Sequence, residues 1–481
     1  MALRTVSPAR NDTEAQSAYA TLRARHLGDM RARIPAALDR LYWPSERLHA
    51  QREAALRNLV RIAKAGSRWQ RARLRHVDPE TLTERSLQDV APMTKDEVMD
   101  NFDAISTDPR ITLATVEAHL QSLRSDAYLF DRFHVNASGG SSGRRGIVVF
   151  DWDAWAEYFL GFFRQLIRLR LRNGTAADRP MVGAIVAAQD PTHSSGSLPV
   201  TFSDPASAFW HRYPVTLPLD EIIAGLNAVQ PELLGGYPSL VHQLAICAQG
   251  GALSIAPKIV FCSSEPLLPE IRAAIHSAWG VTPLNMWAAT EGGALASSCG
   301  EGPGLHLSDD TVIVEPVDER GAPVAAGVRS AKVLVTPLFN PTPLPLLRYE
   351  ITDEITLLDE CCPCGSAHRL IADIEGRMDD TFDYGTARVH PHIFRSRLAQ
   401  ERGIVEYQIR QTATGAQIDI RRDGRVDMEA LRAGLVGDLR RAGLSTPDVV
   451  IAAVSSIPRP ASGKLKRFIA LPAGSTAQSP T

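Results

Sequence analysis

The sequence predicts an α/β fold with a large N-terminal body and a small α+β C-terminal domain. In the middle of the 481-residue chain, short β-like runs alternate with helical segments, which is typical of a parallel-rich sheet covered by helices. From about Ala331 the pattern becomes rich in β-like runs and prolines, and we expect a distorted β-barrel subdomain there. From Asp380 to Leu471 a second strand–helix order begins, long enough for a separate small domain.

The N-terminal region from Ala18 to Arg75 is predicted to be helical. Apolar residues recur there at helical spacing, among them Leu27, Ile34 and Leu41. Residues 1–15 are polar, and we expect them to be disordered. The many arginines of this region suit either nucleic acid or the solvated face of packed helices. Acidic residues elsewhere in the chain balance the charge of these arginines, which favours the interpretation as a solvated face of packed helices.

The middle of the chain contains four predicted strands and three predicted helices. The strands are short apolar runs rich in β-branched residues, at residues 146–150, 181–188, 258–262 and 283–287. The helices have 3.6-residue periodicity and lie at residues 220–229, 239–248 and 269–279. Ser239 and Pro269 stand where helix starts favour these residue types.

The C-terminal domain has its own order of elements. Strands are predicted at residues 405–411, 417–421 and 449–454, with a helix at 427–442. The tail at residues 472–481 consists of small and polar residues, and we expect it to be disordered.

Composition excludes several classes of protein. The chain has 52 Lys and Arg against 54 Asp and Glu, a formal net charge of −2, which argues against a protein that coats nucleic acid or an anionic membrane. No apolar run approaches the roughly 20 residues of a membrane helix, and the N-terminus lacks the apolar core of a signal peptide. We therefore expect a cytoplasmic protein with no nucleic acid or membrane partner, and a homodimer as its assembly.

A glycine- and serine-rich loop precedes the first predicted strand. It reads Asn136-Ala-Ser-Gly-Gly-Ser-Ser-Gly-Arg-Arg-Gly146. Its backbone N–H groups and hydroxyls can surround phosphate oxygens without steric obstruction. It is not a Walker A loop, because no Gly-Lys-Ser/Thr follows. Taken alone such a loop is equally typical of a linker, but its place inside an α/β body favours phosphate.

A hydroxyl and a carboxylate stand side by side at the end of the last predicted strand of the body. In the segment 285–293, Thr290 can donate to a phosphate and Glu291 can hold Mg²⁺, while Trp287 offers a flat face to a base. Taken alone, the segment is also typical of a plain loop with one surface acid.

Three later segments carry further charged side chains. Asp353 can accept hydrogen bonds from ribose hydroxyls, and Arg377 can hold ribose or phosphate. Lys464 lies in a glycine-containing loop near the C-terminus. In isolation, such a basic segment is usually just solvated surface.

These five segments occur in the order of the adenylate-forming (acyl-AMP ligase) superfamily, and the sequence resembles its phenylacetate–coenzyme A ligase-like branch over residues 59–467. Further signs of that branch are Gly236-Tyr-Pro-Ser239, Ser263-Ser-Glu-Pro266, Gly304-Leu-His306 and Cys362-Pro-Cys-Gly365. The resemblance implies ATP-dependent activation of a carboxylic acid as acyl-AMP with pyrophosphate release, the use of Mg²⁺, and transfer to coenzyme A. It also implies an N-terminal adenylation body at 1–378 and a mobile C-terminal lid at 379–481.

The resemblance assigns nucleotide-binding roles by position. Thr290 would contact the α-phosphate and Glu291 would ligate Mg²⁺. The residues that would hold the β- and γ-phosphates are Ser138, Gly140, Ser141, Ser142 and Gly143. The other ATP- or AMP-binding residues would be Ser264 and Glu265, which would line the adenine, and Trp287, Ala289, Asp353 and Arg377.

The same resemblance implies roles in catalysis for one residue at the expected domain boundary and one in the lid. Lys464 matches the lysine that bridges the carboxylate and the α-phosphate, where a cation lowers the repulsion between two anions. Asp379 matches the hinge about which the lid rotates between the two half-reactions.

The acyl pocket is implied to lie between three segments of the body. Its expected lining is Trp155, Tyr158, Tyr237 and Ala288. Aromatic side chains suit an aromatic or other flat acid, although aromatics at helical spacing are also typical of a plain core. The sequence does not identify the acid.

Two departures from the family pattern concern the acyl pocket and the acceptor. Ala288 replaces a glycine of the family and alters the expected acyl pocket, whereas the segment 383–389 leaves the acceptor open. The usual Tyr-Gly-x-Thr-Glu reads Trp-Ala-Ala-Thr-Glu at 287–291, and the segment 383–389 differs from the usual form of a loop that shapes the coenzyme A tunnel. The alternatives to coenzyme A are an amine, a carrier-protein thiol or an inorganic nitrogen nucleophile such as nitrite. A degenerate nucleotide-binding scaffold is a further alternative, which the joint retention of the motif residues disfavours.

The cysteines are unevenly placed along the chain. Cys299, His306, Cys362 and Cys364 offer a Cys₃His set for a tetrahedral zinc, with Cys361 as a rival ligand. Members of this branch that look similar here carry a structural zinc. The alternative is a group of reduced thiols beside a hydrogen-bonded histidine.

Overall fold

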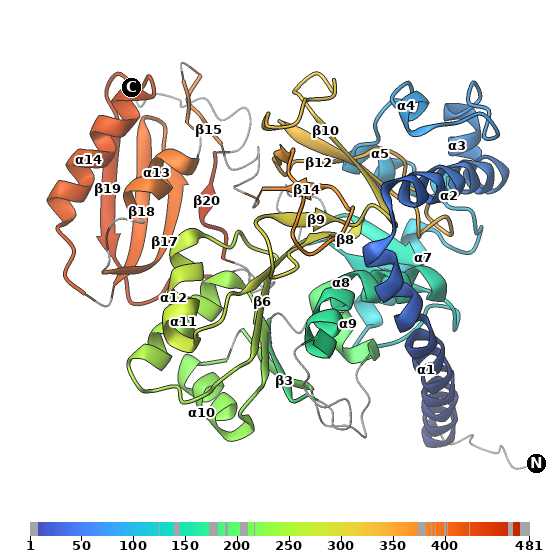
Figure 1. Cartoon of the computed structure of the whole chain (residues 1–481), viewed down its shortest axis with the longest axis horizontal. Helices are drawn as coiled ribbons and strands as arrows, with labels where there is room; N and C mark the ends of the chain where they lie inside the picture. The colour runs from blue at the N-terminus through green and yellow to red at the C-terminus, as the bar shows by residue number, and fades with distance from the viewer. Residues whose placement is uncertain are drawn as a thin grey trace, which may run out of the picture.

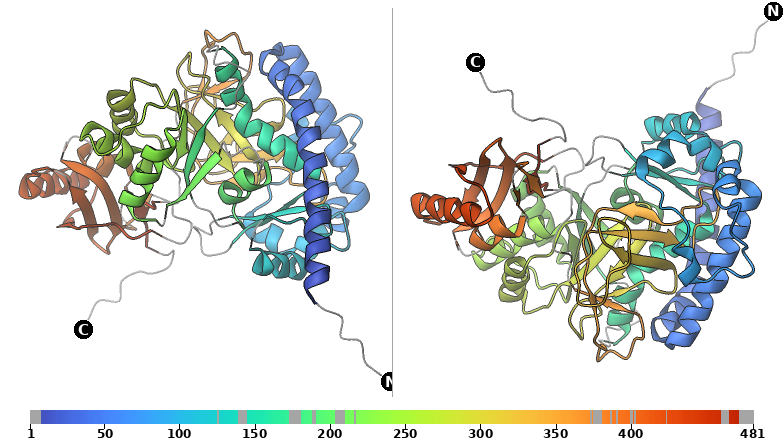
Figure 2. Two further views of the ribbon diagram at one scale, coloured as in Figure 1. Left: turned by 90° about the horizontal axis from the view of Figure 1, so that it is seen from below. Right: turned by 90° about the horizontal axis from the view of Figure 1, so that it is seen from above.

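The structure is a computed structural model of the chain. It describes residues 8–124, 126–138, 145–172, 181–187, 191–202, 210–215, 217–372, 374, 381–385, 387–389, 391–398, 401, 403–422, 424–459 and 465–471. Helical N-terminal elements lie at one end and the C-terminal sheet at the other, with a large sheet between them (Figure 1). The two views of Figure 2 show the same arrangement from below and above.

A nine-stranded sheet forms the centre of the body, in the order β13-β14-β9-β8-β7-β6-β5-β3-β4. The neighbours from β4 to β7 pair in parallel and those from β7 to β13 pair antiparallel. The parallel strands are β3 (Gly183–Ala187), β4 (Trp210–Pro214), β5 (Leu233–Gly236), β6 (Ile259–Ser263) and β7 (Leu284–Ala289). The antiparallel strands are β8 (Gly293–Ser297), β9 (Leu305–Leu307), β13 (Leu357–Leu358) and β14 (Leu370–Ile371). The predicted parallel-rich sheet is therefore confirmed.

Helices cover both faces of the parallel half of this sheet. Ala184 and Val186 of β3 pack toward α10 (Leu219–Val229), α11 (Pro238–Gln249) and α12 (Pro269–Trp279). Ile185, which alternates with them, packs with Leu166 of α8 (Trp152–Arg172) on the other face. Alternate side chains of a strand point to opposite faces, so strands buried on both sides are apolar throughout.

Two long helices, α1 and α2, and several short ones build the N-terminal layer. They are α1 (Pro8–Asp39), η1 (Arg40–Tyr42), α2 (Ser45–Gly66), α3 (Arg68–Arg73), α4 (Glu84–Leu87), α5 (Lys95–Asp100), α6 (Phe102–Ile105) and α7 (Leu113–Ser122). The expectation of disorder at residues 1–15 is wrong for residues 8–15, where α1 has already begun. Proline is favoured in the first turn of a helix, because its missing N–H would have no partner there.

Two small antiparallel sheets flank the central one. The first pairs β1 (His134–Ala137) with β2 (Ile147–Phe150), and α9 (Ser194–Phe202) lies beside β1. The second joins β10 (Val312–Val317), β11 (Lys332–Pro337) and β12 (Tyr349–Ile351). Over the described residues this second region is an open three-stranded sheet, and the distorted barrel stays a prediction.

The C-terminal region has a hydrophobic core of its own. A four-stranded sheet has the order β19-β18-β17-β20, and the buried cluster it shares with two helices draws its members from Phe382 to Phe468 only. The strands are β17 (Ile404–Gln411), β18 (Gly415–Arg422), β19 (Asp448–Ala453) and β20 (Phe468–Ile469). The other elements are β15 (Phe382–Asp383), β16 (Arg388–Val389), α13 (Pro391–Leu398) and α14 (Met428–Arg441). The expected boundary at 378/379 lies outside the described residues.

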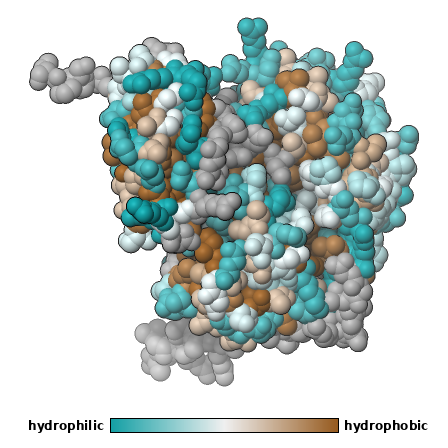
Figure 3. Space-filling view, turned by 60° about the vertical axis from the view of Figure 1, so that its left-hand side comes forward, coloured by the Kyte–Doolittle hydropathy of each residue, from teal (hydrophilic) through white to brown (hydrophobic). Residues whose placement is uncertain are grey.

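Among the described residues, none of the helices is both long enough and apolar enough to cross a membrane. On the face in Figure 3, hydrophobic residues are scattered among hydrophilic ones, which is ordinary for a protein surface.

Candidate functional site

The base of the glycine- and serine-rich loop is held closed by two hydrogen bonds. The Ser138 N–H donates to the Gly146 carbonyl at 2.8 Å, and the Gly146 N–H donates to Ser138 Oγ at 2.9 Å. The antiparallel strands β1 and β2 are thus joined at Ser138 and Gly146, which fixes both ends of the loop. The predicted phosphate ligands Gly140, Ser141, Ser142 and Gly143 lie outside the described residues.

Glu291 reaches the base of this loop. A Cβ atom at Gly146 would lie 3.1 Å from Ser138 Oγ and 3.3 Å from Glu291 Oε1, so these three residues surround one small space. The Tyr349 hydroxyl donates to Glu291 Oε1 at 3.0 Å. Burial, and then the Glu291 charge, raise the pKa of Tyr349, which keeps it a donor. The structure thus brings together three sequence motifs that lie far apart along the chain.

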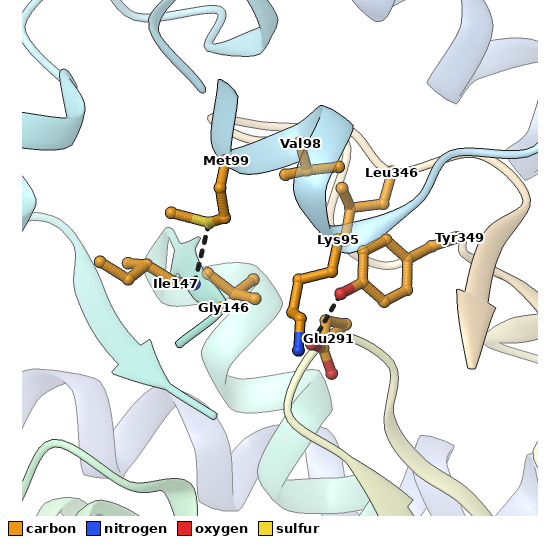
Figure 4. Close-up of a pocket in the computed structure, with 9 residues that line it drawn as sticks. Lys95, Val98, Met99, Gly146, Ile147, Glu291, Leu346 and Tyr349 are labelled. Carbon is orange, nitrogen blue, oxygen red and sulfur yellow. Dashed lines mark hydrogen bonds between the residues drawn. The ribbon is translucent and has the colours of Figure 1, made fainter. Parts of the chain in front are cut away.

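Lys95 enters the same space, and the sequence did not point to it. The cavity in Figure 4 is lined by Lys95, Gly146, Glu291 and Tyr349, with apolar side chains on one side. The Lys95 ammonium points toward Glu291 in this view. A Cβ at Gly146 would lie 3.5 Å from Lys95 Cδ. A cation therefore stands beside the predicted phosphate loop.

Local structure places Lys95 there. The residue before the α5 cap, Met93, pairs with β12 through hydrogen bonds to Arg348 and Glu350. Thr94 then caps α5 in a capping box with Glu97. Lys95 occupies the first helical position, where the helix dipole opposes a cation. That conflict was the one sequence signal that could have singled out this lysine.

Trp287 and Asp353 contact each other. The Trp287 indole N–H donates to Asp353 Oδ2 at 3.2 Å, and the two residues are 6% and 3% exposed. Trp287 packs in the cluster between β8 and the β10–β11 sheet, so little of its ring faces outward. The indole therefore orients the carboxylate predicted to hold ribose, while its own stacking on a base stays a prediction.

Thr290 and Ala289 continue from β7 toward this site. Both are partly exposed, as residues that contact a ligand must be. Ala288 is also partly exposed, and the Tyr158 hydroxyl donates to the Ala289 carbonyl at 3.3 Å. Tyr158 thus touches the segment predicted to line the acid.

The predicted aromatic lining is otherwise core. Trp155, Tyr158 and Tyr237 are at most 2% exposed. Trp155 stacks on His134 with ring centroids 4.5 Å apart, and its N–H donates to Thr201. A substrate would meet Tyr158 at Ala289 before it met Trp155, so Trp155 has the weaker geometric support.

Glu265 lies at a junction between the body and the C-terminal region. Oε2 accepts the N–H of Ser239 at 3.0 Å, and Oε1 accepts the N–H of Leu465 at 2.6 Å. The preceding Ser264 has a φ of 73°, a conformation that is unusual for a non-glycine residue. The predicted residues Arg377, Asp379 and Lys464 lie outside the described residues.

Three thiols and one imidazole form a compact cluster. The side-chain ligand atoms of Cys299, His306, Cys362 and Cys364 all lie within 4.8 Å of one another. The Cys299 and Cys362 sulfurs are 3.5 Å apart, and Cys364 Sγ is 3.4 Å from His306 Nε2. His306 Nδ1 faces the His368 carbonyl at 3.3 Å, which leaves Nε2 directed at the thiols.

Burial distinguishes the two neighbouring cysteines, Cys361 and Cys362, that could complete the ligand set. Cys362 is buried in it, whereas Cys361 is exposed. Burial raises the pKa of the Cys299 thiol, but hydrogen bonds from His306 and from the backbone outweigh burial and lower it. A depressed thiol pKa favours the thiolate that binds metal, whereas burial raises the pKa of the Cys362 and Cys364 thiols, which would lose their protons when an ion binds.

The chain resembles known proteins in part of its sequence. It is 28% identical over 210 residues to the phenylacetate–coenzyme A ligase of Thermus thermophilus, which covers 42% of this chain and 45% of that protein. It is 31% identical over 140 residues to the protein CapK of Staphylococcus aureus, which covers 29% of each. The chain thus spans less than half the length of these curated relatives. No protein-family model matches it.

The fold resembles solved structures over nearly the whole chain. 2-Hydroxyisobutyryl-CoA ligase in the postadenylation state superposes with a TM-score of 0.68, at 17% identity, covering 90% of this chain and 91% of that one. The same ligase in the thioesterification state gives a TM-score of 0.55, at 18% identity and the same coverage. The chain therefore has the fold of this CoA ligase, and its sequence resembles the phenylacetate–coenzyme A ligase branch of the adenylate-forming enzymes.

Proposed function

We propose that this protein is an AMP-forming ligase that activates a carboxylic acid with ATP and transfers the acyl group to coenzyme A. One observation carries the proposal: the closed base of the glycine- and serine-rich loop, Glu291 and the Trp287–Asp353 pair are held in one body by different elements. A phosphate loop, a carboxylate for a divalent cation and a carboxylate for ribose are the groups that ATP needs. The resemblance to a phenylacetate–coenzyme A ligase supports the same chemistry.

The residues fit distinct parts of ATP. Asp353, oriented by the Trp287 N–H at 3.2 Å, accepts hydrogen bonds from the ribose hydroxyls. Thr290 donates to the α-phosphate, and Glu291 is the ligand for Mg²⁺, a hard cation that prefers carboxylate oxygens. The cation, when bound, neutralises charge on the phosphates. Tyr349 holds Glu291 in place at 3.0 Å.

A panel of acids tests this function. ATP–pyrophosphate exchange is measured with the full-length protein and aryl, short aliphatic and 2-hydroxy acids, and AMP release is then followed with coenzyme A. We expect exchange with at least one class of acid and thioester formation when coenzyme A is added. Absence of exchange with every acid, together with no ATP binding by calorimetry, would contradict the proposed enzyme, whereas ATP binding without exchange would favour a degenerate nucleotide-binding scaffold. Exchange without thioester formation would favour an amine, a carrier-protein thiol or nitrite.

Lys95 is proposed to bind the β- or γ-phosphate. Its ammonium stands beside Glu291 and the base of the loop, and a charge-assisted hydrogen bond contributes about 1.5–3 kcal/mol. Lys95→Ala is therefore expected to raise the KM for ATP in the exchange reaction about 10- to 100-fold. The control is Lys258→Ala, which removes an exposed lysine paired with Glu232. An unchanged KM for ATP in Lys95→Ala would contradict a contact between Lys95 and the phosphates.

We further propose that the Cys₃His cluster binds a structural zinc. Three thiols and an imidazole are the donor set of tetrahedral structural zinc, and ligand atoms within 4.8 Å of one another suit that geometry. The ion would join the loop after β8 to the segment before β14. It would thereby stabilise the antiparallel half of the sheet.

Protein purified without chelator is expected to contain about one equivalent of zinc. Elemental mass spectrometry measures this metal content. Cys299→Ser is expected to lower the zinc content and the thermal midpoint. Cys361→Ser, at the exposed neighbouring cysteine, is the matched control and should keep both. A metal content near zero in the unmodified protein would contradict the site.

The domain organisation is part of the proposal. We infer an adenylation body at 1–378 and a lid at 379–481 that rotates about Asp379, because the C-terminal residues bury a core of their own. A cytoplasmic location and a homodimer stay predictions of the sequence. Gel filtration with light scattering tests the dimer.

A further inference from the structure

We propose that Glu265 is a positioning residue for adenylation, which holds the C-terminal segment against the body instead of contacting adenine. This inference rests on the proposed function. It changes the role that the sequence resemblance suggested for Glu265, which was to line the adenine. It is argued from the described contacts on both sides of the junction.

The body presents Glu265 in a fixed direction. β6 ends at Ser263, and Ser264 then turns the chain with a φ of 73°. This brings the carboxylate to the start of α11, where the Ser239 N–H donates to it at 3.0 Å. The first N–H groups of a helix lack partners within the helix and favour an anion. α11 thus holds one oxygen of Glu265.

The C-terminal segment uses the other oxygen. The Leu465 N–H donates to Glu265 Oε1 at 2.6 Å. Leu465 follows Lys464 directly in the chain. A single carboxylate therefore joins α11 to the residue next to the proposed catalytic lysine.

Arg459 reinforces the same junction. Its guanidinium donates to Ser239 Oγ at 3.1 Å and lies 3.8 Å from Glu265 Oε1. It also pairs with Glu406 of β17, and Glu406 in turn accepts from Gln243 of α11 at 3.0 Å. Charges of opposite sign thus face each other across the two regions.

Burial decides between the two roles of Glu265. Its side chain is 4% exposed, and a buried carboxylate must be paired. Both oxygens already accept a hydrogen bond from the protein, so little of the carboxylate is left for a base. The arrangement also superposes better on the postadenylation state of the solved CoA ligase than on its thioesterification state. This likeness of the whole chain supports the inference that the contact acts in adenylation.

Hydrogen exchange tests the contact without any substrate. In the full-length protein, Glu265→Gln is expected to speed exchange at least about tenfold in peptides that contain Ser239 and Leu465. Peptides from β7 and β18 should keep their protection, since each lies inside its own core. Glu221→Gln, on the exposed side of α10, is the matched control. Unchanged exchange at both amides would overturn the contact.

Steady-state kinetics then test whether the contact serves adenylation. They use the acid that the ATP–pyrophosphate exchange panel selects. Glu265→Gln and Arg459→Gln should lower kcat of ATP–pyrophosphate exchange about 10-fold or more, with KM for ATP within about twofold. Conversion of the synthetic acyl-adenylate to thioester should stay within about twofold. A raised KM for ATP with normal kcat would instead support a contact between Glu265 and adenine. If the unmodified protein activates no acid, the proposed function fails, whereas hydrogen exchange still reports on the contact.

Discussion

Replacement of Lys464 by alanine is expected to lower ATP–pyrophosphate exchange by about 10²- to 10³-fold while ATP binding stays nearly unchanged. By resemblance, Lys464 bridges the carboxylate and the α-phosphate, where negative charge builds between two anions. Removing one preorganised donor from such a site lowers kcat by about this factor. Calorimetry with ATP and exchange with the selected acid separate binding from chemistry.

Lys466→Ala is the matched control for this prediction. It removes a lysine two positions further along, whose backbone carbonyl accepts a hydrogen bond from Gln408 and would remain. Its exchange rate should be close to that of the unmodified protein. Equal loss in both variants would indicate a general effect of charge, and normal exchange in Lys464→Ala would refute the assigned role.

Replacement of Asp310 by asparagine is expected to lower the free energy of unfolding of the body by about 3–5 kcal/mol, because the buried Arg164 guanidinium loses the carboxylate with which it pairs. Arg164 of α8 donates to both Asp310 oxygens, at 2.6 and 2.8 Å. Arg40 of η1 lies 3.0 Å from the same carboxylate. The Asp310 and Arg164 side chains are 0% and 4% exposed. This carboxylate thus joins the N-terminal layer, α8 and the loop before β10.

The pH dependence of this pair has a definite sign. Burial raises the pKa of Asp310, but the charges of Arg164 and Arg40 outweigh burial and hold it below its ordinary value. A carboxylate with a depressed pKa stabilises the fold at pH values above its unfolded pKa. That contribution is lost as the pH falls through the folded pKa. The free energy of unfolding measured in urea should therefore fall for the unmodified protein as the pH is lowered from 7. It should fall less for Asp310→Asn, which lacks this carboxylate at every pH.

Glu429→Gln is the control for Asp310. It breaks an exposed ion pair with Arg432 on α14, and exposed pairs add little to stability. Its urea midpoint should match that of the unmodified protein. A midpoint for Asp310→Asn that also matches would show that the buried pair is not important for stability.

Most of the regular elements could be predicted from the sequence. The helix predicted at 269–279 is observed as α12 with the same bounds, and the strand predicted at 258–262 is observed as β6 one residue later. Local patterns suffice here, because apolar periodicity and helix-start residues act over a few positions. The onset of α1 at Pro8 was missed, since polar residues alone do not separate a helix from a disordered tail.

The candidate site was only partly predictable. Motif order pointed to Glu291 and Asp353, and the structure gives each a hydrogen-bond donor that the sequence did not assign to it, Tyr349 for the first and the Trp287 N–H for the second. Lys95 was missed, because its position depends on a pairing between Met93 and β12. That pairing joins residues about 250 positions apart and leaves no local signal.

The sequence by itself determined the fold class, the order of the motifs and the residue types that suit ATP and a divalent cation. These properties depend on periodicity and on side-chain chemistry, which a chain carries before it folds. Only the tertiary structure decided that Trp155 is core, that Cys362 and not Cys361 joins the thiol cluster, and that Glu265 faces Leu465. Burial and long-range contact decide such questions, because they depend on which distant elements pack together.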